Sequence, residues 1–380
     1  MALSLGLVGL PNSGKTTLFN ALTRAGAQVA SYPFTTIEPN VGVVPVPDRR
    51  LDDIARIVKP ERVVPTTVEF VDIAGLVEGA SHGEGLGNQF LGHIRNVDAI
   101  VMVLRAFADQ DVAHVYGTID PVRDAQTLTI ELALADMATV ERRMDRIRQA
   151  ARSGDKQLQH ELDVLELAHG QLANGLPIRR LPLPPADLAL VQTLNLLTVK
   201  PLLYAVNVAE DDLADVASGS RLASSAGQWL SGIKDVAKAE KAEVVVVSAK
   251  LECELADLSD EEAVEYLATL GVQEAGLIQL IHASYRLLNL VTFFTTTGGK
   301  EVRAWTVVNG TRVPEAAGKI HTDMEKGFVR AEVVSYQYLM GAGSFQEARD
   351  RGLLRIEGRE YVVQDGDVIH IRFNVGPKPS

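Results

Sequence analysis

The chain has 380 residues, enough for two or three domains, and its apolar share of 46% is ordinary for a globular protein. The formal net charge of −12 argues against a protein that coats nucleic acid, and we expect no direct DNA binding. A single cysteine excludes an intrachain disulfide, and no stretch is long and apolar enough to cross a bilayer. We therefore expect a cytoplasmic protein with no membrane partner.

The first motif follows a short apolar run at residues 3–8, which predicts a buried strand. Residues 9–16 read Gly-Leu-Pro-Asn-Ser-Gly-Lys-Thr and match the phosphate-binding pattern G-x-x-x-x-G-K-[ST]. A helix-like stretch follows, so backbone N–H groups and a helix start would face phosphate oxygens. We expect the Lys15 ammonium at the β- and γ-phosphates and the Thr16 hydroxyl on Mg²⁺. The expected nucleotide contacts here are Asn12, Ser13, Gly14, Lys15, Thr16 and Thr17.

An apolar run at residues 67–71 ends in Asp72, which begins an Asp-x-x-Gly pattern. An aspartate at the end of a strand can hold Mg²⁺ directly or through water, and the Gly75 N–H can reach the γ-phosphate. The next residue is Leu76, where many GTPases have a glutamine that orients the attacking water. Leucine cannot hydrogen-bond water, so another group must place it.

Two loops near the predicted phosphate site carry further signals. Residues 32–39 contain Thr35 and Thr36, and the hydroxyl of one of them should complete the magnesium shell. Residues 79–87 contain four glycines, which free the backbone to change conformation. This composition favours a switch loop that orders around a γ-phosphate, although a plain flexible loop has the same composition.

Further buried-strand candidates recur through the first 250 residues, with helical stretches between several of them. Such alternation predicts an α/β protein with a mostly parallel sheet, helices on both faces and ligands at the carboxyl ends of the strands. The candidate strands are residues 41–46, 67–71, 99–104, 202–206 and 244–247.

Residues 125–175 have a different pattern, in which apolar residues recur every three or four positions. Two such series, separated by Ser153-Gly154-Asp155, predict an antiparallel helical hairpin, and an ordinary pair of core-packing helices is the alternative. The first series is Ile130, Leu134, Met137, Val140, Met144, Ile147 and Ala151, and the second is Leu158, Leu162, Leu165 and Leu172.

Base recognition is predicted after the strand at 202–206. Guanine-specific proteins of this class carry Asn-Lys-x-Asp there, whereas this chain has Asn207-Val208-Ala209-Glu210. The lysine is missing and the carboxylate is one methylene longer, so we expect weak or absent guanine specificity. We expect base contacts from Asn207, Val208 and Glu210, and from Ser248 and Ala249 after the strand at 244–247.

From about residue 291 the pattern indicates a separate small α+β domain. Residues 291–296 and 302–308 are predicted strands, and Asn309-Gly310 is a strong signal for a tight hairpin turn. Asp365-Gly366 separates two further short runs near the end of the chain.

These residues together closely resemble the YchF/Obg-like ATPase family. The segments that fit are residues 9–17, 32–40, 72–76 with their glycine-rich continuation, 207–210, 300–306 and 317–323. The resemblance implies a Ras-like P-loop core (1–124 and 198–285), a helical coiled-coil insertion (125–197) and a C-terminal β-grasp TGS domain (290–376). It also implies slow Mg²⁺-dependent ATP hydrolysis with weaker use of GTP, a nucleotide-dependent switch, and binding to the ribosome through its large subunit or the 70S particle. A GTPase of ribosome assembly or translation is the alternative.

The family pattern also refines two choices. It favours Thr36 over Thr35 as the magnesium ligand, which gives Thr16, Thr36 and Asp72 as the expected set. It points to His114, in a matching His-Val segment, as the residue that positions or deprotonates the attacking water. His82 and His93 are rivals, and Arg95 or Arg105 could stabilise charge instead. Lys15 and His114 are therefore the expected catalytic residues.

Overall fold

The computed structural model describes residues 3–24, 28–30, 39–73, 86–151, 155–218 and 225–374, and its chain divides into two compact units. The first unit comprises Met1–Val44 and Glu69–Leu287, and the second comprises Pro45–Val68 and Leu288–Ser380. The expected first domain ran through residues 45–68 without a break. The structure instead groups this segment with the C-terminal unit.

A seven-stranded sheet, counted over the described residues, forms the centre of the first unit in the order β2-β3-β5-β1-β6-β7-β8. Strands β5, β1, β6, β7 and β8 pair in parallel, whereas β2 runs antiparallel to β3. Every residue of β6 and β7 is buried, as expected for strands covered on both faces. The strands are β1 (Ser4–Val8), β2 (Gln28–Ala30), β3 (Asn40–Pro45), β5 (Thr67–Asp72), β6 (Ala99–Ala106), β7 (Leu202–Val208) and β8 (Glu243–Val247).

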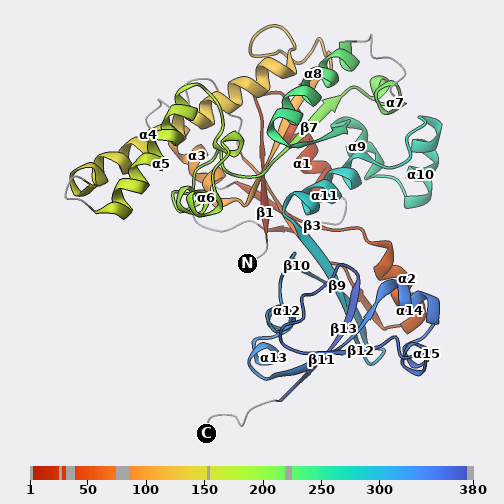
Figure 1. The fold of residues 1–380 in the computed structure, drawn as a ribbon. Helices are drawn as coiled ribbons and strands as arrows, with labels where there is room; N and C mark the ends of the chain where they lie inside the picture. The colour runs from red at the N-terminus through yellow and green to blue at the C-terminus, as the bar shows by residue number, and fades with distance from the viewer. Residues whose placement is uncertain are drawn as a thin grey trace. The chain divides into compact units, whose positions relative to one another are not determined.

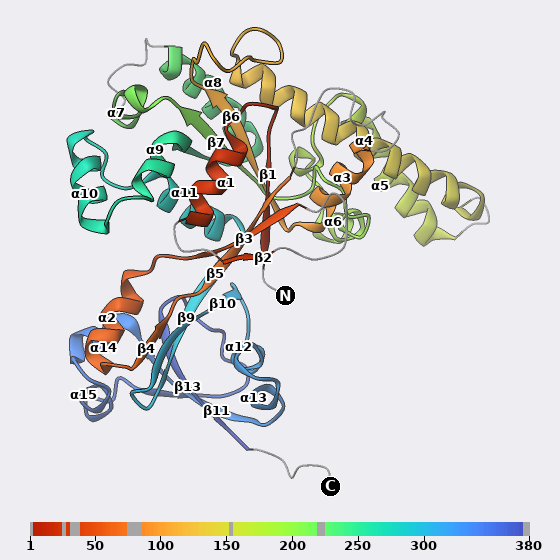
Figure 2. The same cartoon turned by 180° about the vertical axis from the view of Figure 1, so that it is seen from behind.

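Helices cover both faces of this sheet (Figures 1 and 2). Helices α4 (Pro121–Ala151) and α8 (Ser225–Glu240) pack against β6, while α1 (Lys15–Arg24) packs on β1 and α11 (Gly276–Leu287) on β7 and β8. The remaining helices of the sheet region are α3 (Leu86–Asn96), α7 (Glu210–Ser218), α9 (Ala249–Leu255) and α10 (Asp260–Thr269).

The helical insertion is built from α4 and α5 (Lys156–Ala173), which run side by side in both views (Figures 1 and 2). The first half of α4 packs on the sheet, and its second half packs against α5 through a separate apolar core. Asp155 caps α5 by accepting hydrogen bonds from the amides of Gln157 and Leu158. Ile130, placed in the predicted seam, is 45% exposed because this part of α4 still faces the sheet with its opposite side. The chain returns through η1 (Ile178–Arg180) and α6 (Pro185–Gln192).

The second unit contains a six-stranded sheet in the order β12-β11-β13-β9-β10-β4, again counted over the described part of the chain. One face packs against α12 and α13, and the other against α2 and α14. The strands are β4 (Arg62–Val64), β9 (Leu290–Thr297), β10 (Glu301–Val308), β11 (Phe328–Ser335), β12 (Arg355–Glu357) and β13 (Asp367–Phe373). The helices are α2 (Arg49–Val58), α12 (Val313–Ile320), α13 (Thr322–Lys326), α14 (Tyr336–Ala342) and α15 (Phe345–Asp350).

Residues 45–68 join this unit because their apolar side chains find partners there. Leu51 and Ile54 of α2 are buried in the same core as Phe294 and Leu339. Strand β4 adds to the edge of the sheet by pairing in parallel with β10. Arg50 strengthens the attachment with an ion pair of 2.6 Å to Asp365.

The hairpin turn between β9 and β10 lies at Gly298-Gly299, where both φ angles are positive, and not at Asn309-Gly310. The hairpin turn predicted at Asn309-Gly310 does not form, since these residues follow β10 and lead toward α12. No helix within the described ranges is both long enough and apolar enough to span a membrane.

Candidate nucleotide site

The loop of residues 9–16 joins β1 to α1 at the carboxyl edge of the first sheet. Asn12 and Gly14 have φ angles of +63° and +87°, which turn the backbone tightly before the helix begins. A Cβ on Gly9 would lie 2.6 Å from both the Ser13 Oγ and the Val103 carbonyl oxygen. The loop is therefore closely wrapped, and glycine is required at its first position.

Three of the predicted phosphate and metal residues meet at this loop. The Lys15 ammonium lies 2.6 Å from the Asp72 Oδ1, and the Thr16 hydroxyl donates a hydrogen bond of 3.2 Å to the Asp72 Oδ2. The side chains of Lys15 and Asp72 are only 8% and 9% exposed. A cation, a hydroxyl and a carboxylate thus converge where β1 and β5 end side by side.

Asn207 joins the phosphate loop to the loop before α9. Its side-chain Nδ2 donates to the Ser13 carbonyl at 3.1 Å, and its Oδ1 accepts from the Ala249 backbone N–H at 2.9 Å. Asn207 is 3% exposed, and a Cβ on Gly14 would lie within 2.1 Å of its Nδ2. The residue predicted to contact the base therefore also holds two loops of the site together.

Glu210, the residue that replaces the guanine-specific aspartate, begins α7. Its carboxylate accepts a hydrogen bond of 2.6 Å from the Tyr266 hydroxyl of α10, and this bond raises the pKa of Tyr266. Val208 is buried at the end of β7, and Ser248 is buried at the N-cap position of α9. Tyr266 could not be found from the sequence, because it lies 56 residues from Glu210 in an otherwise ordinary amphipathic helix.

His114 lies in the loop after β6, and its side chain is buried against that of Asp124 of α4. Its Nε2 is 2.9 Å from the Asp124 Oδ2, and its Nδ1 accepts from the Tyr116 backbone N–H at 3.1 Å. Because an amide donates to Nδ1, the Nε2 is the ring nitrogen that faces the Asp124 carboxylate as a donor. Both ring nitrogens are thus engaged by the protein, a restraint that the sequence did not predict.

The rival groups have other contacts. Arg105 is buried and donates to the carbonyls of residues 107, 109, 112 and 113. Arg95 donates to the Asn195 carbonyl and to the Thr139 hydroxyl. His93 lies on α3, half-buried. Thr36, Gly75, Leu76 and His82 lie outside the residues that the structure describes, as does Thr35.

Glu252 of α9 is a buried carboxyl that the sequence did not single out. It is 3% exposed, accepts from the backbone N–H groups of Gly276 and Leu277, and leaves its Oε1 without a hydrogen-bond partner among the described residues. Burial raises the pKa of Glu252 to about 7, above its ordinary value of 4.5. The folded protein therefore holds a proton that the unfolded chain releases between these two pH values.

We expect this carboxyl to make the protein less stable as the pH rises from 5 to 8. The unfolded state binds fewer protons over that interval, so the free energy of unfolding falls, by about 3 kcal/mol for this one group. Replacing Glu252 by glutamine should remove that loss and make the variant the more stable protein at pH 8. Urea unfolding at the two pH values measures the difference, and Glu254→Gln, an exposed change on the same helix, is the control. Parallel pH profiles for wild type and Glu252→Gln would contradict the expectation.

Comparisons with known proteins extend over the whole chain. Residues 4–147 match the model of the "50S ribosome-binding GTPase" family, and residues 290–374 match the YchF-GTPase C-terminal model, described as "Protein of unknown function (DUF933)". The chain is 52% identical over 375 residues to "Ribosome-binding ATPase YchF" of Bacillus subtilis (strain 168). It is 51% identical to the protein of that name from Haemophilus influenzae, and both alignments cover 99% of this chain and 100% of the relative.

A solved structure agrees with these alignments. The "Structure of the Schizosaccharomyces pombe YchF GTPase" matches with a TM-score of 0.82 and 35% sequence identity, over 97% of each chain. Together with the two family models, this match confirms the expected fold, an α/β P-loop core with a C-terminal domain.

Proposed function

The chain belongs to the YchF family, and on this premise we propose that it is a ribosome-binding ATPase that hydrolyses ATP slowly. The observation that carries the proposal is the meeting of Lys15 and Thr16 with Asp72 at the end of the phosphate loop. Curated relatives carry the name ATPase, and one solved relative is described as a GTPase. An ATPase and a GTPase differ in the nucleotide base that they bind, so the residues that contact the base decide between the two descriptions.

The phosphate end of the site fits a triphosphate. The backbone amides of residues 12–17 are proposed to hold the β- and γ-phosphates, with the Gly75 N–H at the γ-phosphate. The Ser13 Oγ is buried without a hydrogen-bond partner among the described residues, as expected for a group that awaits a ligand. The Lys15 ammonium would leave Asp72 and stabilise the charge that develops on the γ-phosphate.

The donor set also fits Mg²⁺, which prefers oxygen ligands and keeps several waters. The Thr16 hydroxyl and the Asp72 carboxylate are already adjacent, and we propose Thr36 as the third ligand. When bound, the ion would neutralise phosphate charge and orient the γ-phosphate. Release of Lys15 from Asp72 would free both the cation for phosphate and the carboxylate for the metal shell.

His114 is proposed to place the water that attacks the γ-phosphate. A neutral imidazole can accept a proton from water, but here the Tyr116 amide occupies the Nδ1 lone pair. The proposed role therefore requires the ring to turn away from Asp124 and the Tyr116 amide when nucleotide binds. Such a change would couple hydrolysis to the conformation of the loop after β6.

We propose adenine as the favoured base because one oxygen of the carboxylate that would pair with guanine already accepts a hydrogen bond from Tyr266. The guanine N1–H and amino group need an acceptor, whereas Glu210 is hydrogen-bonded to Tyr266. We propose that Asn207, Val208, Ser248 and Ala249 line the rest of the base pocket. The preference for ATP would then come from the loss of a guanine-specific contact, and not from a new hydrogen bond specific for adenine.

Equilibrium titrations of ATP and GTP in the presence of Mg²⁺ test the proposal. We expect ATP to bind at least about tenfold more tightly than GTP, since a lost base contact costs 1.4 kcal/mol or more. When the titrations are repeated in EDTA, which removes Mg²⁺, both ATP and GTP should bind more weakly, and ATP should remain the tighter ligand. A reproducible preference for GTP would overturn the ATPase assignment and favour the GTPase alternative.

Ribosome binding is proposed to depend on the nucleotide state, in the cytoplasm where ribosomes are found. The names of the curated relatives support a ribosomal partner, and we propose the large subunit or the 70S particle as the form bound. Co-sedimentation with 70S ribosomes and isolated subunits, in ATP, ADP and a non-hydrolysable analogue, tests both points. Equal pelleting in all three nucleotide states would contradict a switch.

A further inference from the structure

The sheet of the second unit opens between two of its central strands. Strands β9 and β13 are parallel neighbours, but their register consists of the single pair Val368 and Phe294. Beyond this pair, Thr295–Thr297 pair with β10 and Ile369–Phe373 pair with β11, each on the outer side. The inner edges of the two strands therefore face each other without a ladder between them.

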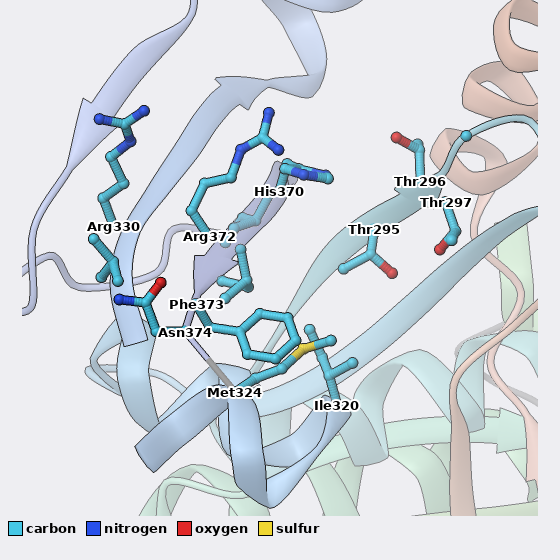
Figure 3. A pocket seen from close by; sticks show the side chains of 14 residues that line it. Thr295, Thr296, Thr297, Ile320, Met324, Arg330, His370, Arg372, Phe373 and Asn374 are labelled. Carbon is cyan, nitrogen blue, oxygen red and sulfur yellow. The ribbon is translucent and has the colours of Figure 1, made fainter. Parts of the chain in front are cut away.

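A cavity of about 710 Å³ fills this opening (Figure 3), within the range of sites that hold compact ligands. Its walls include residues from both faces of the sheet. On one face lie Thr296, His370 and Arg372, and on the other lie Ile371 and Phe373. Because the side chains of a strand alternate between faces, an extended chain placed here would also present alternate residues to two different walls.

The two walls differ in chemistry, and we propose that the opening binds an extended polypeptide segment in which acidic and apolar residues alternate. The polar wall carries His370 and Arg372, and the exposed Arg330 also lines the cavity (Figure 3). None of the described residues that line the cavity is an aspartate or a glutamate. The opposite wall is apolar, formed by Ile320 and Met324 together with the odd-numbered residues of β13.

The backbone supplies the affinity in this proposal. An extended segment that enters between β9 and β13 can hydrogen-bond along the edge of either strand, as in known cases of strand addition. Acidic side chains would then meet the arginines, and apolar side chains would cover Met324 and Phe373. Arg372 already pairs with Glu332 at 3.0 Å, so Arg330 is the more available cation for an incoming carboxylate.

Binding of a defined probe to the full chain tests the proposal. The probe is a six-residue peptide of alternating glutamate and valine with blocked ends, measured by calorimetry. Two control peptides are compared with it. In one, lysine replaces each glutamate, and in the other, alternate backbone nitrogens carry a methyl group. We expect each control peptide to bind at least about tenfold more weakly, because each loses either the charge complementarity or the edge hydrogen bonds. Hydrogen exchange of residues 295–297 and 369–373 should slow when the probe binds.

Two variants locate the binding. Arg330→Glu should weaken the probe at least about tenfold, whereas Arg312→Glu, an exposed arginine of the same unit outside the cavity, should leave it unchanged. ATP titration of both variants confirms an intact chain and keeps this test separate from the nucleotide site. Equal binding of the N-methylated probe, tighter binding of an oligouridylate RNA, competition by inorganic phosphate alone, or no binding of the probe would each overturn the proposal.

Discussion

Replacement of Lys15 by alanine is expected to lower kcat/KM for ATP by about a thousandfold. The proposed role of this ammonium is to stabilise charge on the transferring phosphoryl group, and removal of such a group costs about 4 kcal/mol in transition-state energy. Malachite-green assays of phosphate release measure the loss. Lys234→Ala, an exposed lysine of α8, is the control and should retain full activity.

Lys15→Ala should also lower the stability of the protein, and this effect can be separated from the loss of activity. Without Lys15, the buried carboxylate of Asp72 keeps the Thr16 hydroxyl as its one remaining side-chain partner among the residues that the structure describes. We expect the nucleotide-free variant to lose about 2–4 kcal/mol of unfolding free energy. Adding Asp72→Asn should restore much of this stability without restoring hydrolysis. Full activity in Lys15→Ala would contradict the assignment of the phosphate site.

Replacement of Asn207 by alanine is expected to weaken ATP binding by about ten- to a hundredfold and to destabilise the protein by about 2–4 kcal/mol. The change leaves the buried carbonyl of Ser13 and the buried N–H of Ala249 without their side-chain partner, and each unsatisfied group costs about 1–3 kcal/mol. Urea unfolding of the nucleotide-free protein measures the stability, and titration measures the affinity.

Asn309→Ala is the matched control for this prediction, because the side chain of Asn309 is exposed and donates a long hydrogen bond of 3.4 Å to the exposed Asn289. It should change neither quantity by more than about 0.5 kcal/mol. If Asn207→Ala kept wild-type affinity while losing stability, Asn207 would be a purely structural link between the loops. Its proposed place in the base pocket would then be wrong.

Local pattern was enough to predict the phosphate loop and the strands that lead into it. The order of glycines, Lys15 and Thr16 determines backbone geometry over a few residues, and the short, nearly all-apolar runs favoured buried strands. The sequence also indicated that Lys15 and Asp72 belong to one phosphate and metal site, because parallel strands end at the same edge of a sheet, but it did not predict their direct ion pair. These inferences need no knowledge of which distant segments pack together.

Long-range pairing explains what the sequence did not predict. Asn309-Gly310 and Gly298-Gly299 both suit a tight turn, and only the register of β9 with β10 selects the second. The contacts of Glu210 with Tyr266 and of His114 with Asp124 likewise depend on how helices pack. Residues 45–68 also depend on long-range packing. The sequence of α2 has an apolar face, but it does not indicate which core that face packs into.

The discontinuous second unit has a consequence for synthesis of the chain. Residues 45–68 leave the ribosome early, while the strands that receive them are translated roughly 220 residues later. At 5–20 residues per second, Leu51 and Ile54 wait about 10–50 s for Phe294, the first residue of their core to be made after them. During that interval α2 is a nascent amphipathic segment without its native neighbours, and a chaperone that binds exposed apolar helices would have its longest opportunity there.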